Sequence, residues 1–178
     1  MNDNFDVKAL EKDKPKKRIN SRTKGNTFER KIAKILNERF NTKDFCRTPG
    51  SGAFATTHTL PAYLQIHGDL ITPINFKYTI ECKKGYNKEG LCELFNSKSK
   101  LISMIAQARR DSMKVSQSFL LILSQDRKEP LVITDECLER FVEIEQINAS
   151  FSWGRVSIVT LNDFLSLADS HFFNEEPL

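Results

Sequence analysis

Two carboxylates and one ammonium group in the middle of the chain have types and spacing that could do chemistry. Glu81 and Lys83 lie in residues 76–83, where apolar and polar side chains alternate as in a β-strand. Because alternate side chains share a face of a strand, we expect Glu81 and Lys83 side by side. Asp69 lies in a second expected strand, residues 67–72, and a hairpin or meander between the two strands would bring it to Glu81.

An acidic pair of this kind suits a magnesium ion, which prefers oxygen ligands and keeps several waters. Asp69 and Glu81 are the expected ligands, with the carbonyl of Cys82 as a further one. The ion would polarise a phosphate and help to generate hydroxide. Lys83 would orient the attacking water or stabilise the charge that develops on the phosphate. The residues alone leave an alternative open, in which Glu81 and Lys83 are a surface ion pair on a solvated strand face.

A third acid, Glu29, lies in a helix expected over residues 27–40. Its apolar residues recur at helical spacing, and Asn26 is the expected N-cap. Two roles remain open for Glu29. It has the spacing of a capping box with Asn26, and it also borders the buried stripe of the helix, from which it could bind metal directly or through water.

A glycine-rich segment, RTPGSGAF at residues 47–54, separates this helix from the acidic strands. Exposed backbone amides and the hydroxyl of Ser51 suit phosphate binding, and Arg47 adds a cation. A plain connecting loop is the alternative.

The elements that must position these residues follow from the remaining pattern. Further strands are expected at residues 44–47, 118–124, 131–134 and 155–160, and further helices at residues 97–113 and 161–168. The helix at 97–113 carries a basic surface that includes Arg109 and Arg110. This order predicts an α/β fold with a central mixed sheet flanked by helices.

Composition fits one soluble domain. The chain has 178 residues, of which 39% are hydrophobic and 28% charged. No apolar run is long enough for a membrane span and no secretory signal opens the sequence, so we expect a cytoplasmic protein, in the host cytoplasm if viral. The four cysteines form no CxxC pair, which argues against a zinc site. His171, near the end, is expected to be exposed.

The basic charge gathers at the N-terminus. Residues 8–24 hold eight lysines and arginines, and we expect residues 1–24 to be a flexible basic arm and residues 25–178 a single domain. Such an arm fits a polyanion such as nucleic acid, although a solvated tail is the simpler alternative.

Five segments in this order resemble the PD-(D/E)xK nuclease superfamily, and within it the archaeal-type (Hjc-like) Holliday junction resolvases and their bacteriophage-encoded relatives. They are KGNTFERKIAKIL (24–36), RTPGSGAF (47–54), HGDLITP (67–73), TIECKKG (79–85) and IAQARRDS (105–112). The likeness covers roughly residues 24–134. The stretch between Ser51 and Asp69 is longer than in compact archaeal members, and the part beyond Thr134 has no counterpart.

The resemblance implies a restriction-endonuclease-like fold of about five strands and assigns roles by position. The expected catalytic residues are Glu29, Ser51, Asp69, Glu81 and Lys83, with Asp69, Glu81, Cys82 and Glu29 around the metal. The expected DNA-binding residues are Arg47, Ser51, Lys24, Arg30, Lys84, Gln107, Arg109 and Arg110.

The implied function is that of a DNA endonuclease dependent on Mg²⁺ or Mn²⁺. It would act as a homodimer on four-way junctions or other branched DNA, in phage DNA recombination or replication, with no membrane partner. Two alternatives remain open. One is a restriction-like or repair and end-processing nuclease, and the other is a non-catalytic DNA-binding recombination accessory protein.

Overall fold

A mixed five-stranded sheet forms the centre of the computed structural model, which describes residues 20–49, 64–138 and 144–174. Its strand order is β4-β5-β6-β8-β7. Only β4 and β5 run parallel, and the other neighbours pair antiparallel. The strands are β4 (Tyr78–Lys84), β5 (Ser118–Ser124), β6 (Leu131–Thr134), β7 (Gln146–Phe151) and β8 (Gly154–Thr160). The expected α/β fold with a mixed sheet flanked by helices is therefore confirmed.

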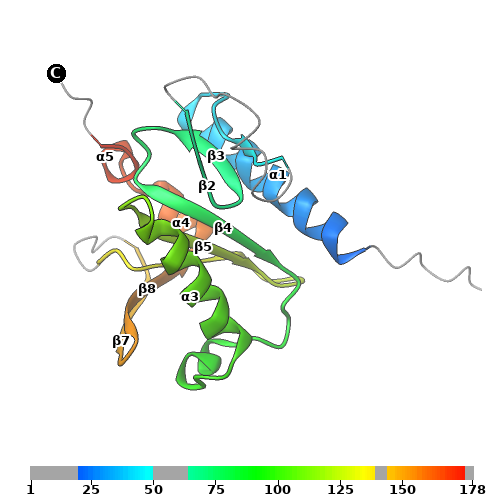
Figure 1. The fold of residues 1–178 in the computed structure, drawn as a ribbon, viewed down its shortest axis with the longest axis vertical. Helices are drawn as coiled ribbons and strands as arrows, with labels where there is room; N and C mark the ends of the chain where they lie inside the picture. The colour runs from blue at the N-terminus through cyan, green and yellow to red at the C-terminus, as the bar shows by residue number, and fades with distance from the viewer. Residues whose placement is uncertain (1–19, 50–63, 139–143, 175–178) are drawn as a thin grey trace, which may run out of the picture.

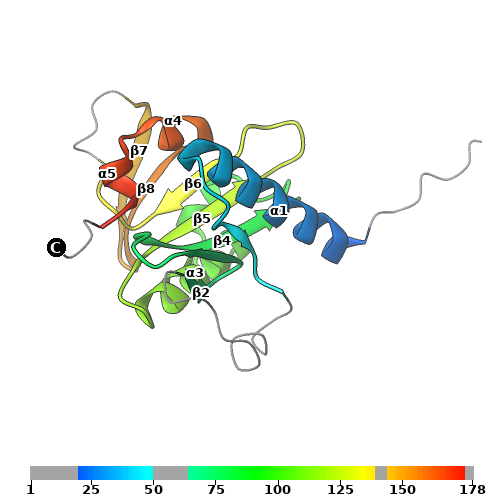
Figure 2. The same ribbon diagram turned by 90° about the horizontal axis from the view of Figure 1, so that it is seen from above.

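Helices cover both faces of the sheet (Figures 1 and 2). The helices are α1 (Ser21–Phe40), the short 3₁₀ helix η2 (Leu91–Phe95), α3 (Lys100–Met113), α4 (Leu161–Ser166) and α5 (Asp169–Phe172). One hydrophobic core packs α1, α4 and α5 against the sheet, and a second packs η2 and α3 against the opposite face. Within the described residues no helix is long and apolar enough to cross a membrane.

Strand β4 lies between these two layers, and its alternation is as expected. Tyr78, Ile80 and Cys82 belong to the core under α1. Glu81 and Lys83 therefore point to the other face, which α3 covers. The connection from β4 through α3 to the parallel strand β5 brings that helix back over the sheet.

A small antiparallel sheet in the order β1-β3-β2 lies beside β4. Its strands are β1 (Cys46–Arg47), β2 (Leu64–His67) and β3 (Leu70–Pro73). The single strand expected at residues 67–72 is wrong, because the chain turns between β2 and β3. The hairpin or meander that could have brought this strand to β4 does not form either, since in the described residues the two sheets meet through one parallel bridge, between Gly68 and Ile80.

Helix α1 begins earlier than the apolar spacing indicates. Asn20 caps it, because its side chain accepts a hydrogen bond from the backbone N–H of Arg22 at 3.0 Å. The prediction that Asn26 is the N-cap is therefore wrong. Residues 21–24, expected in the basic arm, form the first turn of α1, whereas residues 1–19 lie outside the described part of the chain.

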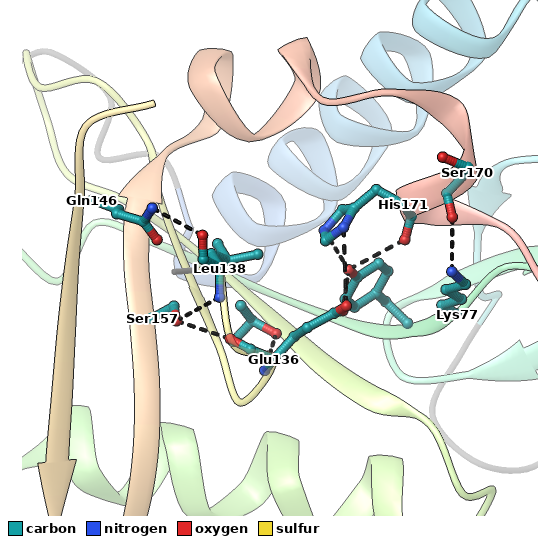
Figure 3. A network of polar contacts seen from close by, with 9 residues as sticks. Lys77, Glu136, Leu138, Gln146, Ser157, Ser170 and His171 are labelled. Atoms are coloured by element: carbon teal, nitrogen blue, oxygen red, sulfur yellow. Dashed lines mark hydrogen bonds and ion pairs between the residues drawn. The ribbon is translucent and has the colours of Figure 1, made fainter. Parts of the chain in front are cut away.

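A buried polar network fastens the C-terminal segment to the start of β4 (Figure 3). The hydroxyl of Tyr78 donates a very short hydrogen bond to Glu136 and lies 2.7 Å from Nε2 of His171. His171 is buried, contrary to the sequence-based expectation, since α5 folds back onto the core under α1. Lys77 adds a hydrogen bond from Nζ to the carbonyl of Ser170 at 2.8 Å. Residues after β8 therefore help to fix the strand that carries Glu81.

We predict that Tyr78→Phe lowers the free energy of unfolding by about 1–3 kcal/mol, because Glu136 and His171 lose a buried hydrogen-bond partner. Urea unfolding followed by circular dichroism measures the change. Tyr86→Phe is the matched control, as the hydroxyl of Tyr86 makes no hydrogen bond within the described residues. Equal stability of the two variants would contradict this role of Tyr78.

Candidate active site

The turn at Gly68 places Asp69 against the free edge of β4. Gly68 has a φ of +73°, and a Cβ atom there would lie 2.2 Å from the carbonyl oxygen of Ile80. Only glycine allows this close approach. The N–H of Asp69 then donates to the Ile80 carbonyl at 2.8 Å, and the N–H of Cys82 donates to Oδ2 of Asp69 at 2.8 Å. Asp69 is thus fixed to β4 by two hydrogen bonds on that strand's free edge.

Glu81 and Lys83 form a partly buried pair under α3. Lys83 Nζ donates a very short hydrogen bond to Oε1 of Glu81, and Gln107 Nε2 donates to the same oxygen at 3.0 Å. Only 6% of the Glu81 side chain and 18% of the Lys83 side chain are exposed. The alternative of an ion pair on a solvated face is therefore wrong. Gln107 holds the Glu81 carboxylate from α3, the helix that covers this face of the sheet.

Burial, together with the crowding of negative charge, shifts the pKa of Asp69 upward. Burial, and then the charges of Glu81 and Glu29, raise the pKa of Asp69 to about 6, against the hydrogen bond from Cys82 and the charge of Lys83. Burial alone would lower the pKa of Lys83, but the hydrogen bond and charge of Glu81 and the charge of Asp69 raise it overall. Lys83 therefore remains an ammonium ion at neutral pH, which suits a role as a cation better than one as a general base.

Glu29 is held by Arg47 rather than by a helix cap. Arg47 Nε donates to Oε2 of Glu29 at 2.5 Å, and its NH2 group donates to Oδ1 of Asn26 at 3.0 Å. Asn26 lies inside α1, so the capping-box role proposed for Glu29 is wrong. The charge of Glu29 nevertheless acts on Asp69. Glu29 and Arg47 thus flank the acidic pair from α1 and β1.

The donor set at the edge of β4 fits a hard divalent cation. Oδ1 of Asp69 accepts no hydrogen bond from the described residues, and a cation would relieve the repulsion between Asp69 and Glu81. The N–H and C=O of one strand residue point to the same side, so the carbonyl of Cys82 faces Asp69 as well. No three His, Cys, Asp or Glu side chains in the described ranges are grouped closely enough to hold an ion. The candidate ligands are therefore two carboxylates and a backbone carbonyl.

The other expected DNA-binding residues are spread around this centre. Lys24 and Arg30 are exposed on α1, and Arg110 is exposed on α3. Arg109 points away, because its guanidinium donates to the carbonyls of Trp153 and Arg155 at 2.6 and 3.0 Å and anchors the β7–β8 hairpin. Ser51 lies outside the described residues.

Two residues with clear roles in the geometry were missed by the sequence reasoning. Gly68 lies inside a segment read as one strand, where an isolated glycine before an acid signals a turn or a close backbone approach. Asn26 was read as a cap, although it holds the guanidinium of Arg47. No local pattern reveals the contact between Asn26 and Arg47, because the pairing of β1 with β3 brings Arg47 to α1.

The PD-(D/E)xK class of nucleases combines a mixed sheet with three features. These are an acid in a turn, a strand with an ExK pattern and a polar helix beside that strand. Residues 20–173 match the model of the family described as "Phage putative PDDEXK endonuclease". The match spans most of the chain, and the chain therefore belongs to this family of phage endonucleases. Comparison with the curated proteins and with the solved structures found no match.

We predict that Gly68→Ala displaces Asp69 and lowers endonuclease activity at least tenfold, because the added methyl group would clash with the Ile80 carbonyl. Cleavage rates at saturating metal measure the effect. Gly85→Ala is the matched control, since Gly85 also has a positive φ but no atom lies within 4 Å of an added Cβ. A similar loss in both variants would show that backbone strain, rather than this close approach, matters.

We predict that Asp69→Asn stabilises the metal-free protein at pH 8 and not at pH 4. The pKa of Asp69 in the folded chain, about 6, lies above its ordinary value of 3.8. The folded state thus holds the proton more tightly, and stability is lost as pH rises from about 4 through 6. Asparagine does not ionise, so the variant avoids this loss, which reaches up to about 3 kcal/mol in the free energy of unfolding. Thermal unfolding in EDTA at both pH values measures the difference, and a destabilised variant at pH 8 would contradict it.

Proposed function

We propose that this endonuclease depends on Mg²⁺ or Mn²⁺ and hydrolyses phosphodiester bonds in branched DNA. Its preferred substrate is the four-way junction of phage DNA recombination or replication, and it acts as a homodimer. The observation that carries the proposal is the juxtaposition of Asp69 and Glu81 through the backbone of Cys82. These groups supply the oxygen ligands that a catalytic divalent cation needs.

Each side chain has a defined task in this mechanism. A bound cation would supply Lewis acidity toward the scissile phosphate and would lower the pKa of a water bound to it. Asp69 and Glu81 would hold this cation, and Gln107 keeps the Glu81 carboxylate oriented through the 3.0 Å hydrogen bond. Lys83, a cation fixed beside Glu81, orients the attacking water or stabilises the negative charge on the phosphate. Glu29 assists from α1, in the position that Arg47 gives it.

Two features favour this mechanism over a non-catalytic DNA-binding protein. The chain keeps an ionisable Asp69 in a site where burial and two other acids oppose its charge. It also devotes Gln107 and Lys83 to the orientation of one buried carboxylate. A protein that only binds DNA gains nothing from a cluster of acids, since these repel the phosphate backbone.

The proposal for branched DNA is supported by the resemblance to junction resolvases, whereas a restriction-like or end-processing nuclease would share the same centre. A substrate panel separates these possibilities. The panel consists of a four-way junction, a flap, a linear duplex and a single strand, each with Mg²⁺, with Mn²⁺ and with EDTA. We expect paired nicks across the junction and little cutting of duplex. Cleavage of plain duplex at a fixed sequence would favour the restriction-like alternative.

The test of the centre itself uses charge-neutral, near-isosteric variants. We expect Asp69→Asn and Glu81→Gln to lose about 10³-fold or more in cleavage rate while still binding DNA in EDTA. Glu38→Gln is the control, because Glu38 is an exposed acid paired with Lys34 on the outer surface of α1. Normal cutting by either site variant would show that the centre lies elsewhere.

A further inference from the structure

The two parallel strands β4 and β5 end side by side at an exposed ion pair. Lys84 and Ser124 are register partners, and Lys84 Nζ donates a hydrogen bond to Oγ of Ser124 at 3.0 Å. The same Nζ lies 3.6 Å from Oδ1 of Asp126. The side chains of Lys84 and Asp126 are 28% and 58% exposed, so solvent and ligands can reach this pair. It lies one residue beyond Lys83 of the candidate centre.

Asp126 is held in place from its other side. Asn87 Nδ2 donates to Oδ2 of Asp126 at 2.8 Å, and the N–H of Asp126 donates to Oδ1 of Asn87 at 2.8 Å. This reciprocal pair leaves Oδ1 of Asp126 directed at Lys84. The hydrogen bond from Asn87 and the charges of Lys84 and Lys24 lower the pKa of Asp126, against the opposing effect of desolvation.

A second lysine, on α1, adds to the positive charge around the same carboxylate. The charge of Lys24 contributes to the lowering of the pKa of Asp126. Both views of the fold show the N-terminal end of α1 projecting past the sheet on the side where β5 ends (Figures 1 and 2). Asp126 thus pairs with Lys84 of β4 and is also subject to the charge of Lys24 on α1.

We infer that this end of the sheet binds the sugar-phosphate backbone of DNA next to the cleavage site, and that Asp126 occupies the place of a phosphate beside Lys84 until DNA displaces it. The identity of the ligand as DNA rests on the proposed function. A carboxylate and a phosphodiester offer Lys84 the same kind of anionic oxygen acceptor. Breaking an exposed ion pair costs little, so exchange is easy.

The two anions compete for the same cations, and this gives the effect of Asp126 a definite sign. In the free protein Asp126 pairs with Lys84 and partly neutralises its charge. On DNA it repels the backbone that replaces it. Removing its charge should therefore strengthen binding. If Asp126 instead served to orient Lys84 toward DNA, removing it would weaken binding.

The experiment measures binding of the full chain to a fluorescent four-way junction by anisotropy, in EDTA, over a range of salt concentrations. We expect Asp126→Asn to lower Kd about two- to fivefold at low salt, with the gain fading as salt rises. Asp111→Asn is the matched control. Asp111 also pairs with a lysine, Lys114, at 2.6 Å, but near the end of α3 and away from the proposed surface. We expect no change in that control.

A second pair of variants tests the cations directly. We expect Lys84→Ala to weaken binding and to reduce the slope of log K against log salt by about 1, as for the loss of one phosphate contact, and Lys114→Ala to leave the slope unchanged. Unchanged or weaker binding by Asp126→Asn, or an unchanged slope for Lys84→Ala, would overturn the inference. If the unsubstituted chain binds no DNA, the proposed function fails together with it.

Discussion

The close approach of Gly68 to the backbone of Ile80 is the contact on which the arrangement of the site depends. It joins a small antiparallel sheet to the edge of the central sheet through the bridge between Gly68 and Ile80. Two hydrogen bonds follow from it, and they hold Asp69 opposite Cys82. Without this contact, the acid of one sheet would have no fixed position relative to Glu81 on the other. Gly68, which has no side chain, therefore determines where Asp69 lies relative to Glu81.

Once Asp69 is fixed, electrostatics accounts for the remaining features of the site. Asp69, Glu81 and Glu29 repel one another in a partly buried setting, and burial raises the pKa of Asp69. The protein offsets this repulsion with fixed cations and donors, which are Lys83 and Gln107 on one side and Arg47 on the other. A divalent cation would complete this balance. If the site binds a metal as proposed, it gives up stability in the metal-free state for the sake of that binding.

The alternation in residues 76–83 was enough to predict the strand that carries Glu81 and Lys83 and the faces on which they lie. The parts that depend on distant contacts could not be read in this way. The turn at Gly68 was hidden inside a segment interpreted as one strand, and β7 and α5 carry too little periodic signal in six and four residues to be recognised. His171 was expected in solvent because it lies near the end of the chain, yet Tyr78, distant in sequence, provides its buried partner. The placement of Ser51 stays a prediction.

The most direct test of the account is the location of a bound metal. Crystals of the full chain soaked with Mn²⁺ would give anomalous scattering at the ion's position. We predict a single strong peak at the free edge of β4, between the carboxylates of Asp69 and Glu81 and beside the carbonyl of Cys82, and no such peak in crystals of Glu81→Gln. A peak that is bound elsewhere, or one that persists unchanged in Glu81→Gln, would contradict the assignment of this edge as the nuclease centre.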